Sequence, residues 1–254
     1  RAARALGPRR AAAEEPLASL LARAQECAPA DAASLLRTLS TLARGHIAVD
    51  EPILWRLAAA VQELRGLGYR EVVSAELAFE ALGFLQEPLS ELLGQRRRLA
   101  LEAAPLPALL RELLDAERDA DQDAEPTWLL RSEEAEAALL RAFLQRLEHP
   151  GSEGARAFRD PFECLYYLKR RRQLPTAFLA SMCAWVRRAT RRRADASQAA
   201  AVTAVRLVAL DDACEARGVY GAPRDDLDAA IRAFVAFGTS CGGPGGDPAA
   251  AVSA

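Results

Sequence analysis

Clusters of arginine are the side chains whose type and spacing most clearly indicate chemistry in this sequence, and that chemistry is anion binding. From position 156 to 193 the chain has eleven Lys or Arg residues against only Asp160 and Glu163, a local charge of +9 in a chain of net charge −2. Guanidinium groups bind phosphate and carboxylate through paired hydrogen bonds. The candidate RNA-binding residues are Arg96, Arg97, Arg98, Lys169, Arg170, Arg171, Arg172, Arg187, Arg188, Arg191, Arg192 and Arg193.

The alternative is that these clusters only stabilise the ends of helices. Each cluster follows the end of an expected helix, where a cation is favoured by about 0.3–1 kcal/mol through the helix dipole. One or two arginines would suffice for that purpose, whereas three to five in succession repel one another unless an anion is present. We therefore favour contact with phosphate or with an acidic protein. Lys169 is the only lysine among the 33 basic residues, a bias that a GC-rich genome also produces.

Side chains suited to catalysis or metal binding are sparse. The two histidines, His46 and His149, lie far apart in the sequence. The acidic stretch 115–125, an expected solvated loop, lacks the glycine and the closing glutamate of a calcium loop. The cysteines show no CxxC pair, which indicates free thiols in a reducing compartment; they are Cys27, Cys164, Cys183, Cys214 and Cys241. We expect no catalytic residue, metal site, cofactor or small-molecule substrate, and a protein that is not an enzyme.

Aromatic residues follow helical spacing beside the second basic cluster. Phe158, Phe162 and Tyr166 recur every four residues, which suits either a base-stacking platform or one face of a packed helix. Core packing is the simpler interpretation for these three. Trp55 and Trp185 lie within apolar helical runs and are predicted to be core residues by the same argument.

The whole sequence is typical of an all-α protein. Alanine and leucine are abundant, strand-favouring residues are scarce, and apolar residues recur at helical spacing. No window reaches the roughly 20 apolar residues that span a bilayer. Pairs of helices begin near positions 31, 70, 160 and 195, with a diverged or inserted unit between 105 and 150. Neighbouring pairs are thus roughly 35–40 residues apart, and this spacing predicts an α-solenoid-like array of helical hairpins. The expected helices include 71–82, 132–147, 196–216 and 225–237.

The sequence divides into five expected parts. Residues 1–15 would form a basic segment of the kind seen in an organellar transit peptide or a basic disordered tail, because its first thirteen residues hold four Arg and no acid. Residues 16–104 and 156–237 would form the helical-hairpin repeats, the second set carrying the central basic clusters. Residues 105–155 would form an acidic, diverged helical unit with a loop. Residues 238–254, rich in Gly, Pro and Ala, are expected to be a disordered tail.

The hairpin plan resembles the degenerate helical repeats of organellar RNA-associated proteins, the FAST-kinase-like and heptatricopeptide or octotricopeptide class. The resemblance lies in SLLRTLSTLARG (34–45) with VDEPILWRL (49–57), and next in GYREVVSAELAFEALGF (68–84). The C-terminal RAP domain common in such proteins has no counterpart in 238–254. The resemblance implies RNA binding, or a place in an organellar ribonucleoprotein, without catalysis.

These observations lead to one main expectation and one alternative. The main expectation is a non-catalytic structural subunit of a mitochondrial ribosome in the organellar matrix, holding ribosomal RNA through its arginines and neighbouring subunits through its helical faces. Phosphate contacts of this kind position a protein without recognising sequence. The alternative is a structural accessory subunit of a mitochondrial respiratory or ATP synthase complex, in which the same arginines would meet acidic proteins or lipid head groups.

Overall fold

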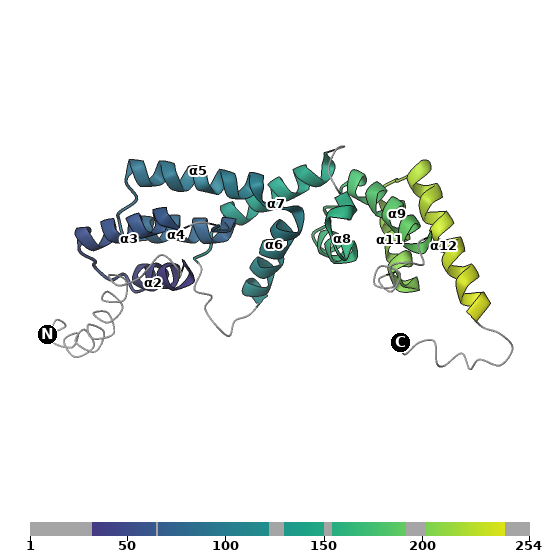
Figure 1. Ribbon diagram of the computed structural model, residues 1–254, viewed down its shortest axis with the longest axis horizontal. Helices are drawn as coiled ribbons and strands as arrows, with labels where there is room; N and C mark the ends of the chain where they lie inside the picture. The colour runs from purple at the N-terminus through teal and green to yellow at the C-terminus, as the bar shows by residue number, and fades with distance from the viewer. Residues whose placement is uncertain (1–31, 65, 122–129, 150–153, 192–201, 242–254) are drawn as a thin grey trace. The chain divides into compact units, whose positions relative to one another are not determined.

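The computed structural model describes residues 32–64, 66–121, 130–149, 154–191 and 202–241 (Figure 1). Within these ranges the regular structure is helical and contains no strand, so the predicted all-α fold is confirmed. None of the helices in these ranges is both long and apolar enough to cross a bilayer. The helices are α2 (Ala32–Arg44), α3 (Glu51–Glu63), α4 (Tyr69–Ala81), α5 (Glu87–Ala103), α6 (Leu106–Asp121), α7 (Glu133–Glu148), the 3₁₀ helix η2 (Gly154–Ala157), α8 (Pro161–Arg170), α9 (Thr176–Arg191), α11 (Ala204–Ala216) and α12 (Ala222–Cys241).

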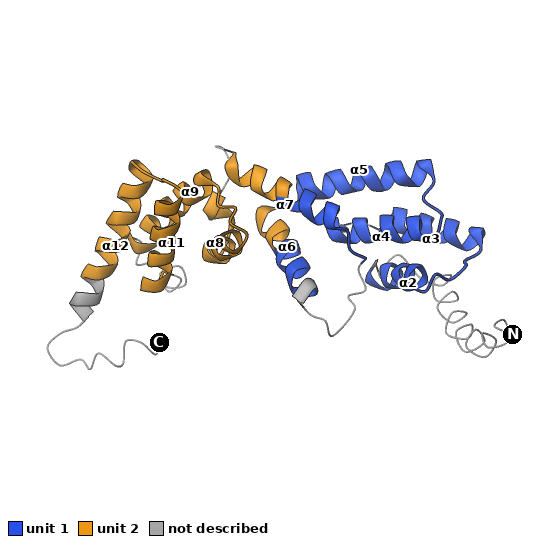
Figure 2. Cartoon of the chain, turned by 180° about the vertical axis from the view of Figure 1, so that it is seen from behind, with its two compact units in different colours: residues 1–104, 111–140 blue, residues 105–110, 141–254 orange. Residues whose placement is uncertain are grey.

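The chain forms two compact units (Figure 2). The first contains residues 1–104 and 111–140, and the second contains 105–110 and 141–254. The unit boundaries fall inside α6 and α7, so residues 105–155 contribute to both units.

One local prediction in this acidic stretch was wrong. Residues 115–121 continue α6 and do not belong to a loop, while the remainder of the expected loop, 122–129, lies outside the described residues. The helix persists because its apolar residues keep helical spacing up to Ala116 and are buried. The buried side chains of α6 are Leu106, Leu109, Leu110, Leu113 and Ala116.

The first unit is built around a leucine-rich core. Helix α2 packs against α3 and α4, and α4 packs against α5. The hydroxyl oxygens of Ser40 on α2 and Ser74 on α4 lie 3.3 Å apart and join the two helices inside this core. Each fully buried leucine contributes about 1.5–3 kcal/mol by leaving water. The largest fully buried side chains of this core are Leu36, Leu39, Leu42, Leu57, Phe79 and Leu93.

Trp55 is not the core residue that the sequence predicted. Its side chain is 44% exposed, with its ring edge-on to Phe84 at a centroid distance of 4.9 Å. Its indole nitrogen donates a hydrogen bond to Glu51. The buried face of α3 is formed by Leu54, Leu57, Ala58 and Val61, and Trp55 lies on the margin of that face.

The second unit is built around aromatic side chains. Helix α9 packs against α12, α11 and η2. Phe158 lies edge-on to Phe178, and Phe162 lies edge-on to Trp185, with ring centroids 6.2 Å apart in both pairs. Phe158, Phe162 and Trp185 are buried, which confirms their prediction as core residues, while Tyr166 is half-buried.

Side-chain caps fix the beginnings of two helices in this unit. Asp160 accepts a hydrogen bond from the backbone N–H of Phe162 at 3.1 Å and so caps α8. Its other carboxylate oxygen lies 2.8 Å from the guanidinium of Arg206, which also covers the ring of Phe162. Thr203 caps α11, so this helix begins at Ala204 and not at the predicted 196; residues 196–201 lie outside the described ranges.

Four of the described helix ends share one hydrogen-bonded turn. After α2, α4, α8 and α11, the residue two positions past the helix has positive φ, and the N–H groups of this residue and the next bond back to helix carbonyls. This pattern is the Schellman motif, in which the left-handed residue is usually glycine. The left-handed residues are His46, Gly83, Arg172 and Gly218.

Candidate functional site

Arg96, in the first basic cluster, caps a neighbouring helix. It projects from α5, and its Nη1 donates hydrogen bonds to the carbonyls of Val61 at 2.7 Å and Leu64 at 3.0 Å. Its Nη2 donates to the carbonyl of Gln62. The last carbonyls of a helix have no intrahelical donor and carry partial negative charge. The guanidinium of Arg96 satisfies both needs at the end of α3.

The other two arginines of this cluster line a surface cavity of about 270 Å³ in the first unit. Nη1 of Arg97 lies 3.0 Å from a carboxylate oxygen of Glu76 on α4. Arg98 is exposed, and the same cavity contains the carboxylates of Glu80 and Glu134. This mixture of charges is less suited to phosphate than an isolated group of cations would be.

The second basic cluster is exposed throughout. Lys169, Arg170, Arg171 and Arg172 are consecutive at the end of α8, and all four are solvent-exposed. The guanidinium of Arg171 lies 5.7 Å from the ring centroid of the buried Tyr167, within the range of a cation–π contact. Lys169 and Arg172 form no ion pair with any carboxylate in the described part of the chain.

The turn that carries this cluster is closed by backbone hydrogen bonds. The N–H of Arg172 bonds to the carbonyl of Lys169 at 3.1 Å, and the N–H of Gln173 bonds to the carbonyl of Leu168 at 3.0 Å. Arg172 has φ of 56°, a conformation costing roughly 1–2 kcal/mol for a residue with a Cβ. The backbone itself therefore caps α8.

The third cluster, at the end of α9, is partly occupied by contacts within the protein. Arg187 is half-buried and forms an ion pair with Asp226 on α12. Arg188 is half-buried and Arg191 is exposed, whereas Arg192 and Arg193 lie outside the described residues. A helix of the length of α9 spans about 24 Å. Since the second cluster directly precedes α9 and the third ends it, the two clusters lie at opposite ends of this helix.

A half-buried carboxylate that sequence reasoning missed lies in the first unit. Glu112 on α6 accepts hydrogen bonds from the backbone N–H groups of Tyr69 at 3.1 Å and Arg70 at 3.2 Å, and so caps α4 from another helix. Burial raises the pKa of Glu112, while the two backbone hydrogen bonds oppose that rise. The sequence offers no signal for this contact, because the two partners are more than forty residues apart.

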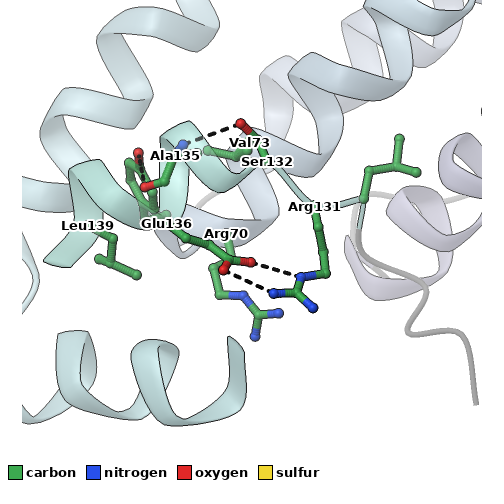
Figure 3. Close-up of a pocket in the computed structure, with 9 residues that line it drawn as sticks. Arg70, Val73, Arg131, Ser132, Ala135, Glu136 and Leu139 are labelled. Atoms are coloured by element: carbon green, nitrogen blue, oxygen red, sulfur yellow. Dashed lines mark hydrogen bonds and ion pairs between the residues drawn. The ribbon is translucent and has the colours of Figure 1, made fainter. Parts of the chain in front are cut away.

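Polar contacts around the start of α7 also escaped the sequence analysis. Figure 3 shows Arg131 joined to the carboxylate of Glu136 by two hydrogen bonds of 2.9 and 3.0 Å. Arg70 lines the same pocket and forms an ion pair of 2.5 Å with Asp119. The pocket has a volume of about 10 Å³, no more than one water molecule requires. These charges therefore serve the packing of the first unit.

Comparisons with known proteins give no family for this chain. No protein-family model and no curated protein matches the sequence. In the described residues, no three His, Cys, Asp or Glu side chains are grouped as metal ligands. The basic clusters are therefore the features of this chain that bear most directly on its function.

Proposed function

We propose that this chain is a non-catalytic helical-repeat protein that binds RNA through the exposed cluster Lys169–Arg172, as a structural subunit of a mitochondrial ribosome. The observation that carries the proposal is the difference between two helix ends. At the end of α3 the guanidinium of Arg96 donates to the carbonyls of Val61, Gln62 and Leu64, of which Val61 also accepts from a backbone N–H. At the end of α8, backbone N–H groups satisfy the carbonyls of Tyr167, Leu168 and Lys169. The side chains of Lys169 and Arg172 are therefore not required to cap the helix.

The conformation of Arg172 supports the same proposal. A left-handed residue in a Schellman turn is most stable as glycine, and Asn, Asp and His are the usual exceptions. Arginine at this position retains a cation in the exposed cluster at a cost in stability. Strained residues of this kind occur most often at binding sites.

The placement of the remaining cations favours an extended partner. Arg191 lies at the far end of α9 from the exposed cluster, and a helix of this length spans about 24 Å. A small ligand cannot span that distance, whereas an RNA helix presents phosphates along its whole length. Arg96, Arg97 and Arg187 already have protein partners, and the proposal does not depend on them.

The arrangement of the helices supports the repeat-array part of the proposal. Four helix pairs, α2–α3, α4–α5, α8–α9 and α11–α12, are each joined by the same Schellman turn. First helices pack together in one unit, as α2 does with α4, and second helices pack together in the other, as α9 does with α12. Such contacts between equivalent helices are typical of stacked hairpins. Stacked hairpins present extended surfaces, which suits a peripheral subunit of a large assembly.

Gradient sedimentation of the tagged protein from detergent-solubilised mitochondria, with and without RNase, tests this function. The expected result is co-migration with ribosomal RNA that RNase abolishes. Co-migration with inner-membrane complexes that RNase leaves intact would contradict the proposal and support a structural accessory subunit of a respiratory or ATP synthase complex. Recovery in the cytosolic fraction would contradict the mitochondrial location, which rests on the Arg-rich, acid-free residues 1–13.

A further inference from the structure

Two cysteines of the second unit lie in contact inside the protein. Cys183 on α9 and Cys214 on α11 are both fully buried, and their sulfur atoms are 3.6 Å apart. A disulfide bond requires a separation of about 2.05 Å, so the two sulfurs need to approach by only about 1.5 Å. Sequence reasoning treated all five cysteines as scattered free thiols, because these two are 31 positions apart.

We infer that Cys183 and Cys214 form a redox-sensitive pair that a peroxide converts to a disulfide, linking α9 to α11. The inference rests on the sulfur contact and on the position of the pair between two helices of different hairpins. It is independent of the proposed RNA binding. In the oxidised form, the hairpin that carries Lys169–Arg172 would be covalently joined to the last hairpin.

The surroundings of the pair favour a thiolate on one sulfur. The two thiols share a hydrogen bond in which either sulfur can be the donor. This bond and the positive charge of Arg224 lower the pKa of Cys214, whereas the contact with Cys214 and burial raise the pKa of Cys183. Arg224 lies 2.6 Å from Asp211, and each of these two side chains is about one-third exposed. Thiolates are the nucleophilic form of cysteine, so Cys214 is the sulfur that reacts first.

The reaction balances with hydrogen peroxide as the oxidant. The thiolate of Cys214 attacks one peroxide oxygen, an S–O bond forms, the O–O bond breaks, and hydroxide leaves to become water. The sulfur of Cys183 then attacks the resulting sulfenic acid. The S–S bond forms, the S–O bond breaks, and the hydroxyl leaves as a second water with the thiol proton. Two thiols have lost two electrons, and one peroxide has been reduced to two waters.

Cys164 provides an internal control. It is fully buried on α8, and burial raises its pKa. In the described part of the chain, the other cysteine side chains, Cys183 and Cys214, contact each other and not Cys164. Cys164 should therefore stay a thiol under conditions that oxidise the pair.

Peptide mapping of the whole chain after mild peroxide treatment tests the inference. The protein is oxidised while folded, blocked with a maleimide, digested with trypsin and examined by mass spectrometry. The expected product joins peptide 173–187 to peptide 207–217, with a mass two hydrogens below their sum, and dithiothreitol separates it. Peptide 160–169, which contains Cys164, should carry the maleimide only after denaturation.

Two outcomes would overturn the inference. One is that both thiols remain fully reducible and alkylable after peroxide treatment of the folded protein. The other is that sulfinic or sulfonic acid forms on Cys214 without the cross-link. The variant Cys183→Ser should abolish the cross-linked peptide and Cys164→Ser should not. The peptide map of the wild-type protein shows whether Cys183 and Cys214 form a disulfide even if either variant fails to fold.

Discussion

Arg172 and Gly83 occupy the same position in two equivalent helix-ending turns, although only one of them is glycine. Their φ angles are 56° and 68°, and in both turns the N–H of the residue bonds to the carbonyl three positions earlier. The N–H of the following residue bonds five positions back. Gly83 therefore adopts this backbone geometry without strain, whereas Arg172 adopts the same geometry with strain.

The variant Arg172→Gly should be more stable than the wild-type protein. Glycine adopts positive φ without steric cost, so the free energy of unfolding should rise by about 0.5–1 kcal/mol. Chemical denaturation measures this change, provided that both the midpoint and the slope of the unfolding curve are fitted. The same variant should bind RNA more weakly, since it loses one cation of the exposed cluster.

The variant Gly83→Ala is the matched control for backbone strain. A Cβ at position 83 would have no atom within 4 Å, so any effect arises from the positive φ and not from a clash. The free energy of unfolding should fall by about 1 kcal/mol. An Arg172→Gly protein that is less stable than wild type would contradict this account of the turn.

Replacing Arg96 by methionine should destabilise the protein. The variant keeps an apolar stem but removes the donors that satisfy the carbonyls of Val61, Gln62 and Leu64. Because the lost hydrogen bonds involve a charged donor at a half-buried site, the free energy of unfolding should fall by about 1–2 kcal/mol. The exposed neighbour Arg98→Met should change it by less than about 0.5 kcal/mol. Equal effects of the two substitutions would contradict the capping role of Arg96.

The half-buried carboxyl of Glu112 predicts a specific pH dependence. Its pKa is raised in the folded protein from the ordinary value of 4.5, so the folded state binds this proton more tightly than the unfolded state. The contribution of Glu112 to stability is therefore present below pH 4.5 and is lost as the pH rises through the folded-state pKa. Relative to Glu112→Gln, the wild-type protein should lose stability as the pH rises above 4.5. A relative gain above that pH in urea unfolding would show that the carboxylate form is the favoured one.

Much of the fold could be predicted from the sequence because local patterns determine it. Apolar spacing located α4 and α7 to within a few residues, and Asp160 marked the start of α8. The failures had identifiable physical causes. The acidic stretch 115–121 remains helical because the buried apolar stripe extends to Ala116, and Trp55 lies at the margin of the α3 stripe that faces the core.

The candidate site was harder to predict, because arginines with the same sequence context have different partners in space. Arg96 and Arg170 both belong to runs of basic residues, yet Arg96 donates to the end of a helix distant in sequence, whereas Arg170 lies on the exposed surface. Only the tertiary structure distinguishes the two situations. The same holds for Glu112 and for the Cys183–Cys214 contact, whose partners are 31 or more positions away.

The measurement that tests the central claim most directly is RNA binding by the purified chain, followed by fluorescence anisotropy with labelled, structured ribosomal RNA fragments. The test variant carries Lys169→Gln, Arg170→Gln and Arg172→Gln. Its matched control carries Arg56→Gln, Arg111→Gln and Arg141→Gln, three exposed arginines on α3, α6 and α7. Both variants lose three positive charges, so a difference in RNA affinity between them cannot arise from net charge alone.

The account predicts that the wild-type and control proteins bind alike and that the test variant binds at least about tenfold more weakly near 0.1 M salt. The slope of log affinity against log salt concentration should be smaller by about 2 to 3 in the test variant, since each lost phosphate contact removes close to one unit. Equal loss in the two triple variants, or no RNA binding by the wild-type protein, would contradict the claim that the exposed cluster at the end of α8 binds RNA.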